Sequence, residues 1–423
     1  MPSARTSGVI LHPTSLPGGR LGREAYEFVD WLAAAGQSWW QVLPLGPPDA
    51  FGSPYTSSSA FACWSGLLAD PEAKVERSEL AQFRARHAFW IGDWERYAGE
   101  GAAADQLRFE REWHALRAHA RSRGVRLIGD LPMYVAGDSA DVAAHPRLFD
   151  PELLAGAAPD ASHPNGQLWG QPVYRWPTLR TQRYWWWIER FRRSFELVDL
   201  LRIDHFRGFV SYWGIPVGST DPLDGAWHRG PGLHLFRAVE AELGRLPLIA
   251  EDLGVITPAV DRLRDAIGAL SMRIIGRSFM KRHRRRQAVA VHPADSVVYT
   301  GTHDHPTLAG WLASASKAER RRATGDLVQA GIAEEESVWP LIRLAFSSRA
   351  RIAIVPMQDV LELGDEGRMN WPGTVGPGNW TWRLPPDALT PELAERLRSV
   401  TVETGRAQQP VANERRAAVF SRA

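Results

Sequence analysis

The stretch VDLLRID, residues 198–204, is a short apolar run that ends in charged residues. Its apolar positions are nearly continuous, which is typical of a parallel strand that is buried on both faces. Seven further runs of this kind, each bounded by turn residues, recur along the chain at 8–12, 39–45, 125–131, 246–251, 272–279, 297–301 and 352–357. The sequence therefore predicts eight buried strands.

Helix-like patterns separate most of these runs, at 23–35, 107–121, 183–196, 232–243 and 257–267. Eight strands that alternate with helices predict an α/β fold, a (β/α)₈ TIM barrel. We expect one catalytic barrel over residues 1–423, because a minimal barrel takes about 250 residues and the rest can form insertions. The expected insertions are a helical one after strand 2 (46–124) and a loop-rich one over the active site after strand 3 (136–180), and 404–423 is expected to be a frayed tail.

Composition excludes several classes of protein. An apolar fraction of 44% excludes a mainly disordered chain. With 50 basic and 48 acidic residues, the net charge of +2 does not favour a dedicated nucleic-acid or membrane binder. The single cysteine, Cys63, excludes an internal disulfide framework and a cysteine-rich zinc site. We find no membrane-spanning stretch and no signal-peptide core, and therefore expect a cytoplasmic protein.

Acidic residues stand at the ends of several predicted strands. Asp130 ends the third strand, Asp204 the fourth and Glu251 the fifth, and His303-Asp304 follows the seventh. Catalytic groups of TIM barrels lie at the carboxyl ends of the strands, so these acids are candidates for chemistry. For any one of these acids the alternative is a role in a structural ion pair, but that alternative explains the whole set less well. The 19 tryptophans are a first indication of a carbohydrate site, because indole faces that are not part of the core can stack on sugar rings.

Asp204 and Glu251 have different expected environments. Arg202 lies two residues before Asp204, on the same strand face, and should lower the pKa of Asp204 and keep it ionised. The apolar residues 248–250 should raise the pKa of Glu251. A protonated Glu beside an ionised Asp on the next strand, with carboxyl groups about 5–5.5 Å apart, is the acid and nucleophile pair of a retaining glycosidase.

Nine stretches carry a resemblance to a known family. They are HPTSLP (12–17), WQVLPLGP (40–47), GSPY (52–55) with SAF (59–61), GDLPMYV (129–135), GQLWG (166–170), RIDHFRG (202–208), AEDLG (250–254), TGTHD (300–304) and NWTWR (379–383). With them the chain resembles the 4-α-glucanotransferases, also called amylomaltases or disproportionating enzymes, a branch of the α-amylase-like barrel enzymes. The matches follow in order along nearly the whole chain.

The resemblance implies a role for each matching residue. It implies that Asp204 is the nucleophile, Glu251 the general acid/base and Asp304 the third acid, which stabilises the transition state. It further implies substrate contacts, made by Tyr55, Asp130, Arg202 and His303 around the reacting sugar, by Trp169 in a glycine-rich loop over the acceptor side, and by Asn370 in a loop near the donor sugars.

The chain departs from the family pattern at four places. These are His305, the stretch 63–65, a shortened insertion between 68 and 107, and the basic run Lys281-Arg282-His283-Arg284-Arg285-Arg286. We expect all four to flank the substrate groove. The basic run is read as a solvated surface loop rather than a nucleic-acid site, because it is short and has no interleaved aromatic residues.

The sequence thus predicts transfer of α-1,4-glucan segments to the 4-hydroxyl of an acceptor glucan, by a retaining double displacement. The expected partners are maltooligosaccharides and α-1,4-glucans, with no nucleic acid and no membrane. No cofactor and no metal are expected, because side chains supply the acid, the base and the nucleophile. Two alternatives stay open: an α-1,4-glucan hydrolase on the same site, and a catalytically silent glucan-binding protein. The oligomeric state is not determined, and a monomer is compatible with the sequence.

Overall fold

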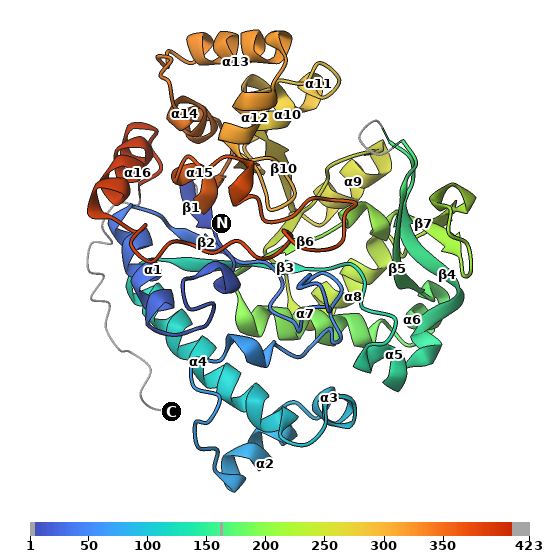
Figure 1. Cartoon of the computed structure of the whole chain (residues 1–423). Coiled ribbons are helices and arrows are strands. Elements are labelled where there is room, and N and C mark those ends of the chain that lie inside the picture. Colours follow the sequence, from blue (N-terminus) through green and yellow to red (C-terminus); the bar gives the residue numbers. More distant parts are fainter. Residues whose placement is uncertain (1–4, 161–163, 408–423) are drawn as a thin grey trace, which may run out of the picture.

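The computed structural model describes residues 5–160 and 164–407, and its centre is a closed parallel barrel of eight strands (Figure 1). In order around the barrel the strands are β1, β12, β11, β10, β9, β6, β3 and β2. Their bounds are Thr6–Ile10 (β1), Trp39–Gln41 (β2), Arg126–Leu131 (β3), Leu200–Ile203 (β6), Leu248–Ala250 (β9), Leu270–Ile274 (β10), Ser296–Tyr299 (β11) and Ile352–Pro356 (β12). Each of the eight predicted runs overlaps one of these strands, so the predicted TIM barrel is confirmed.

Helices cover the outside of the barrel and bury an apolar face against the strands (Figure 1). The longer helices of the chain are α1 (Arg23–Ala34), α2 (Arg77–Arg86), α3 (Ile91–Ala98), α4 (Ala102–Ser122), α7 (Trp185–Leu197), α8 (Leu233–Leu243), α9 (Pro258–Ala266), α13 (Lys317–Gln329), α14 (Trp339–Ser347) and α16 (Pro391–Glu403). Trp186 and Trp187 of α7 are fully buried, so these two tryptophans belong to the core.

Short helices connect these elements. The short α-helices are α5 (Ala140–Ala144), α6 (Trp176–Thr181), α10 (Ile275–Ser278), α11 (Arg284–Gln287), α12 (Leu308–Ser314) and α15 (Met357–Val360). The 3₁₀ turns are η1 (Pro13–Ser15), η2 (Ser65–Leu67), η3 (Pro146–Leu148), η4 (Phe206–Phe209), η5 (Pro222–Asp224), η6 (Val289–Val291) and η7 (Asp365–Gly367).

The sixth barrel strand ends earlier than the apolar run predicts. We expected a strand over 272–279, but β10 ends at Ile274 and α10 begins at Ile275. At this end the side-chain Oε1 of Gln287 accepts a hydrogen bond from the backbone N–H of Ile274 at 2.9 Å. An unbroken apolar run does not distinguish a strand from a buried helical turn, and here it covers both.

A second sheet lies beside the barrel, where the sequence predicted a loop-rich insertion over 136–180 (Figure 1). Its four antiparallel strands have the order β5, β4, β7, β8. Two of them come from that insertion and two from the segment after β6: β4 (Phe149–Ala157), β5 (Gln167–Tyr174), β7 (Ser211–Pro216) and β8 (Ala226–Arg229). The segment is therefore not loop-rich as expected: it forms two strands, and the sheet is completed by two strands from further along the chain.

The expected helical insertion at 46–124 contains α2, α3 and α4. Of these, α4 also packs against α1 and β3, so it serves as the barrel helix before the third strand as well. Most of the predicted tail lies outside the described residues, which end at 407. Within the described part of the chain, no helix has the length and apolar character that a membrane span requires.

Candidate active site

The strand-end acids meet at the carboxyl end of the barrel, as the fold predicts. Strands β6 and β9 are neighbours, and Ile203 is in register with Ala250. The backbone N–H of Glu251 donates to the carbonyl of Ile203 at 3.0 Å, which continues the ladder by one residue. Asp204 and Glu251 are therefore the next residues on two adjacent strands, and they emerge side by side.

Arg202 joins two of the acids from inside the barrel. Its Nη1 donates to both carboxylate oxygens of Asp130 at 2.7 Å, and its Nη2 lies 3.0 Å from Oδ1 of Asp204. Arg202 and Asp130 are buried, whereas the Asp204 side chain keeps 28% of its surface exposed. The guanidinium thus holds Asp204 in place and leaves part of its carboxylate open to a substrate.

The pKa values of the two central carboxyls are both raised. Burial raises the pKa of Glu251 to about 7, assisted by the negative charge of Asp204 and opposed by Arg202. Burial also raises the pKa of Asp204 to about 6, and Arg202 only reduces this rise. The expected lowering for Asp204 was therefore wrong, because desolvation outweighs the ion pair. The expected rise for Glu251 is confirmed, and its pKa is the higher of the two.

One wall of the site is aromatic. The Tyr55 hydroxyl donates to Oδ2 of Asp130 at 2.7 Å, and the Tyr55 ring stacks on His303 with centroids 4.9 Å apart. Trp380 lies 5.8 Å from both rings. In the sequence analysis Trp380 appears only within the motif at 379–383. Its position beside two predicted contact residues makes it a further candidate for a sugar contact.

The third acid is held by side chains from two loops. Asp304 lies 3.2 Å from Nε2 of His303, and it accepts a hydrogen bond from Nδ2 of Asn370 at 2.6 Å. Burial alone would raise the pKa of Asp304, but His303 and these hydrogen bonds hold it below its usual range. The Asn370 amide, predicted to contact sugars, is therefore used at least in part to fix Asp304.

Trp169 lies in a strand and not in the glycine-rich loop that we expected. It belongs to β5, and its Nε1 donates to Oε1 of Gln167 at 3.0 Å. The indole packs edge-on against His205, the residue after Asp204, with ring centroids 4.8 Å apart. His205 has a left-handed backbone with φ of 47°, which turns the chain sharply behind Asp204.

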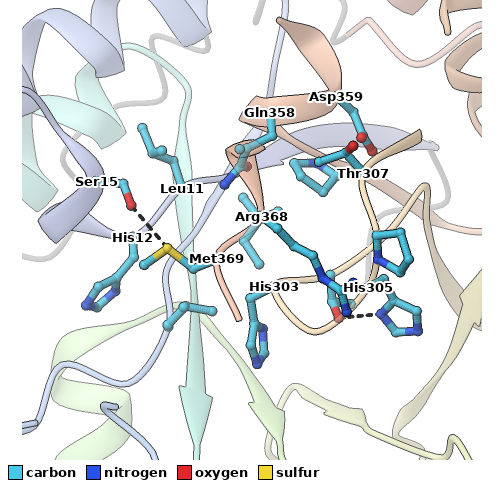
Figure 2. A pocket seen from close by; sticks show the side chains of 16 residues that line it. Leu11, His12, Ser15, His303, His305, Thr307, Gln358, Asp359, Arg368 and Met369 are labelled. Atoms are coloured by element: carbon cyan, nitrogen blue, oxygen red, sulfur yellow. Dashed lines mark hydrogen bonds between the residues drawn. The ribbon is translucent and has the colours of Figure 1, made fainter. Parts of the chain in front are cut away.

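A small cavity of about 30 Å³, with both polar and apolar lining, borders His303 and is large enough for about one or two water molecules (Figure 2). His12, His305, Gln358 and Arg368 are among the side chains that line it. Burial lowers the pKa of His305 to about 3, and its Nδ1 shares a hydrogen bond with the Thr302 hydroxyl at 2.8 Å.

The expectation that the departures flank the groove is wrong for Cys63. Cys63 is buried in the core, and its backbone N–H and carbonyl both bind the Gln106 amide. The basic run is also less solvated than expected. Arg284 pairs with Asp326, and Arg286 pairs with Asp252 and Asp261. In the described residues we find no group of three or more His, Cys, Asp or Glu side chains placed to hold a metal ion.

The comparisons with known proteins agree with this geometry. The profile of the 4-alpha-glucanotransferase family matches residues 11–88 and 100–390. The chain is 38% identical to a 4-alpha-glucanotransferase of Thermus thermophilus, over 95% of this chain and 99% of that one. It is 37% identical to a 4-alpha-glucanotransferase of Synechocystis, over 95% and 98% of the two chains.

A solved structure gives the same result. The amylomaltase from Streptococcus agalactiae, determined in complex with acarbose, superposes with a TM-score of 0.88 at 29% identity, over 96% of this chain and all of that one. None of the comparisons favours the hydrolase or the silent binding protein. The chain therefore belongs to the 4-alpha-glucanotransferase family, enzymes that transfer α-1,4-glucan segments between chains.

Proposed function

We propose that Asp204 is the nucleophile, Glu251 the general acid/base and Asp304 the transition-state stabiliser of this glucanotransferase. The observation that carries the proposal is the pairing of β6 with β9, which brings out Asp204 and Glu251 side by side, with Nη2 of Arg202 3.0 Å from Oδ1 of Asp204. Burial raises the pKa of both carboxyls, to about 6 for Asp204 and about 7 for Glu251, and the raised pKa of Glu251 suits the acid that donates the proton.

The reaction has two displacement steps. In the first, Glu251 gives its proton to the glycosidic oxygen, the bond from this oxygen to the anomeric carbon breaks, and a carboxylate oxygen of Asp204 bonds to that carbon. In the second, the 4-hydroxyl of an acceptor glucan attacks the same carbon, Glu251 takes the hydroxyl proton, and Asp204 leaves as a carboxylate. Two inversions retain the configuration.

The remaining predicted residues are assigned to contacts with the sugars, except Asn370. Tyr55, Asp130, Arg202 and His303 form one connected wall, and we assign to it the sugar that reacts. Trp169, which packs against His205, the residue after Asp204, is assigned to the acceptor. Asn370 is assigned mainly to Asp304, which it contacts directly.

The substrates are proposed to be maltooligosaccharides and longer α-1,4-glucans. The likeness to an amylomaltase determined in complex with acarbose supports this assignment. A cytoplasmic location stays a prediction from the sequence, and the oligomeric state stays open.

The direct test is to incubate the protein and its Asp204→Asn variant with maltotriose and to separate the products. We expect glucose together with oligomers longer than maltotriose from the native chain, and no products from the variant. Glucose and maltose alone would mean that water is the acceptor, and an active variant would remove Asp204 from the mechanism.

A further inference from the structure

The basic run 281–286 has a contact that the activity does not yet explain. Arg286, in the short helix α11, reaches two acids on other segments. Its Nη2 donates to Oδ2 of Asp252 and to Oδ1 of Asp261, both at 2.7 Å, and its Nη1 donates to Oδ2 of Asp261 at 3.0 Å. Asp252 is the residue directly after Glu251.

Asp252 lies where strand β9 leaves the barrel sheet. Its side chain is fully buried, and its Oδ1 accepts a hydrogen bond from the backbone N–H of Met272 in β10 at 2.8 Å. The backbone ladder between these strands ends one step earlier, at Ser271 and Ala250. The carboxylate therefore takes the place of the next backbone acceptor and holds residue 252 against β10.

This attachment complements the one on the opposite side of Glu251. The N–H of Glu251 donates to Ile203 at 3.0 Å, and its carbonyl accepts from the N–H of Phe206 at 3.2 Å, so β6 and the turn after it hold the residue itself. Asp252 holds the following residue to β10. The carboxyl of Glu251 is thus carried by backbone that is fixed to both neighbouring strands.

A fully buried carboxylate needs opposite charge, and Asp252 receives it from arginines that also serve other acids. Arg264 donates to Asp252 at 2.7 Å but also binds Asp261 and Asp265. Arg273 is 3.6 Å away. Within the basic run, Arg286 is the residue that contacts Asp252. Its loss would leave the buried carboxylate of Asp252, next to Glu251, with too little positive charge around it.

We propose that Arg286 is a positioning residue for Glu251, which it keeps aimed at the glycosidic oxygen by holding Asp252 against β10. The inference rests on the proposed role of Glu251. Arg286 is then a clamp next to the site, and its charge serves the buried Asp252 of the same chain.

The test compares two donors that differ in their need for an acid. Maltotriose requires protonation of its leaving group, whereas α-maltosyl fluoride releases fluoride without it. For Arg286→Ala we expect kcat/KM on maltotriose to fall between tenfold and a hundredfold, mainly through kcat, with kcat/KM for fluoride release within threefold of the native value. Arg285→Ala, which removes an exposed arginine next in sequence, is the matched control and should change neither.

Equal losses on both donors would overturn the proposal, since that pattern means a general disturbance of the fold, and so would an unchanged maltotriose rate. If Arg286→Ala fails to fold, Arg286→Lys takes its place, because it keeps the charge but cannot reach both acids in the same way, and a selective loss on maltotriose is again required. Glu251→Gln is measured alongside. If that variant loses both donors equally, the acid role of Glu251 fails, whatever the result for Arg286.

Discussion

The guanidinium of Arg202 lies against Asp204, with Nη2 3.0 Å from Oδ1, while Nη1 binds both oxygens of Asp130. One cation therefore serves two carboxylates. Its effect on Asp204 is smaller than burial, which raises the pKa of Asp204 to about 6. The site thus keeps its nucleophile only slightly more acidic than Glu251, whose pKa is about 7.

The first prediction is a narrow pH optimum. Below about pH 6 Asp204 gains a proton and cannot attack, and above about pH 7 Glu251 loses the proton that it must donate. We expect kcat/KM for maltotriose to fall on both sides of this window. With α-maltosyl fluoride the alkaline fall should disappear, because this donor needs no acid. An alkaline fall that is equal for both donors would assign that limb to a group other than Glu251.

The second prediction concerns the loss of the acid. Glu251→Gln should lower kcat/KM for maltotriose by about 10²- to 10⁴-fold, the usual contribution of general acid catalysis, and leave fluoride release within about tenfold. Both rates are measured on one preparation, with Asp204→Asn as the control that must lose both. A loss of the same size on the two donors would contradict the acid role.

The third prediction locates the covalent intermediate. The enzyme is mixed with an activated fluoro-sugar donor, and its peptides are mapped by mass. We expect one glycosyl group on Asp204, because its carboxylate is held by Arg202 and is partly exposed to the substrate. Asp204→Asn should carry none. An adduct on Asp304 would exchange the roles of these two acids.

The barrel could be predicted from the sequence because its strands are continuous apolar runs followed by charge, as at residues 198–204. The second sheet could not. Strand β4 contains Pro151 and has several exposed positions without regular alternation, and it pairs with β7, more than 50 residues further along the chain. Neither feature gives a local strand signal.

The acids of the site were predicted for the same reason as the barrel, since each stands at the end of a predicted strand or shortly after it. The sequence does not determine how burial and a neighbouring charge balance in setting the pKa of one carboxyl. Arg202 two residues before Asp204 was visible, but the burial that outweighs it depends on how the whole barrel mouth packs. The role of Asn370 was also hidden, because its contact with Asp304 joins positions 66 residues apart.

The fourth prediction tests that contact. Asn370→Ala removes a hydrogen bond to a charged carboxylate, worth about 1.5–3 kcal/mol, and should lower kcat/KM for maltotriose by roughly tenfold to a hundredfold. Thr374→Ala is the control in the same loop, since the Thr374 hydroxyl donates to the carbonyl of Trp371 within that loop, and it should keep the rate within threefold. Losses of equal size in the two variants would show that only the loop fold matters.

The last prediction separates donor from acceptor. Trp169 packs edge-on against His205 and is not part of the wall of Tyr55, Asp130, Arg202 and His303 that is assigned to the reacting sugar, so its removal should weaken acceptor binding and spare the first displacement. For Trp169→Ala we expect the KM for an added maltose acceptor to rise about tenfold, as the loss of roughly 1.4 kcal/mol of aromatic contact requires. Fluoride release from α-maltosyl fluoride should keep its kcat/KM within threefold, and Trp169→Phe should lie between the two on the acceptor KM. If fluoride release falls as steeply as acceptor binding, the indole instead supports the turn at His205 that presents Asp204, and the acceptor assignment fails.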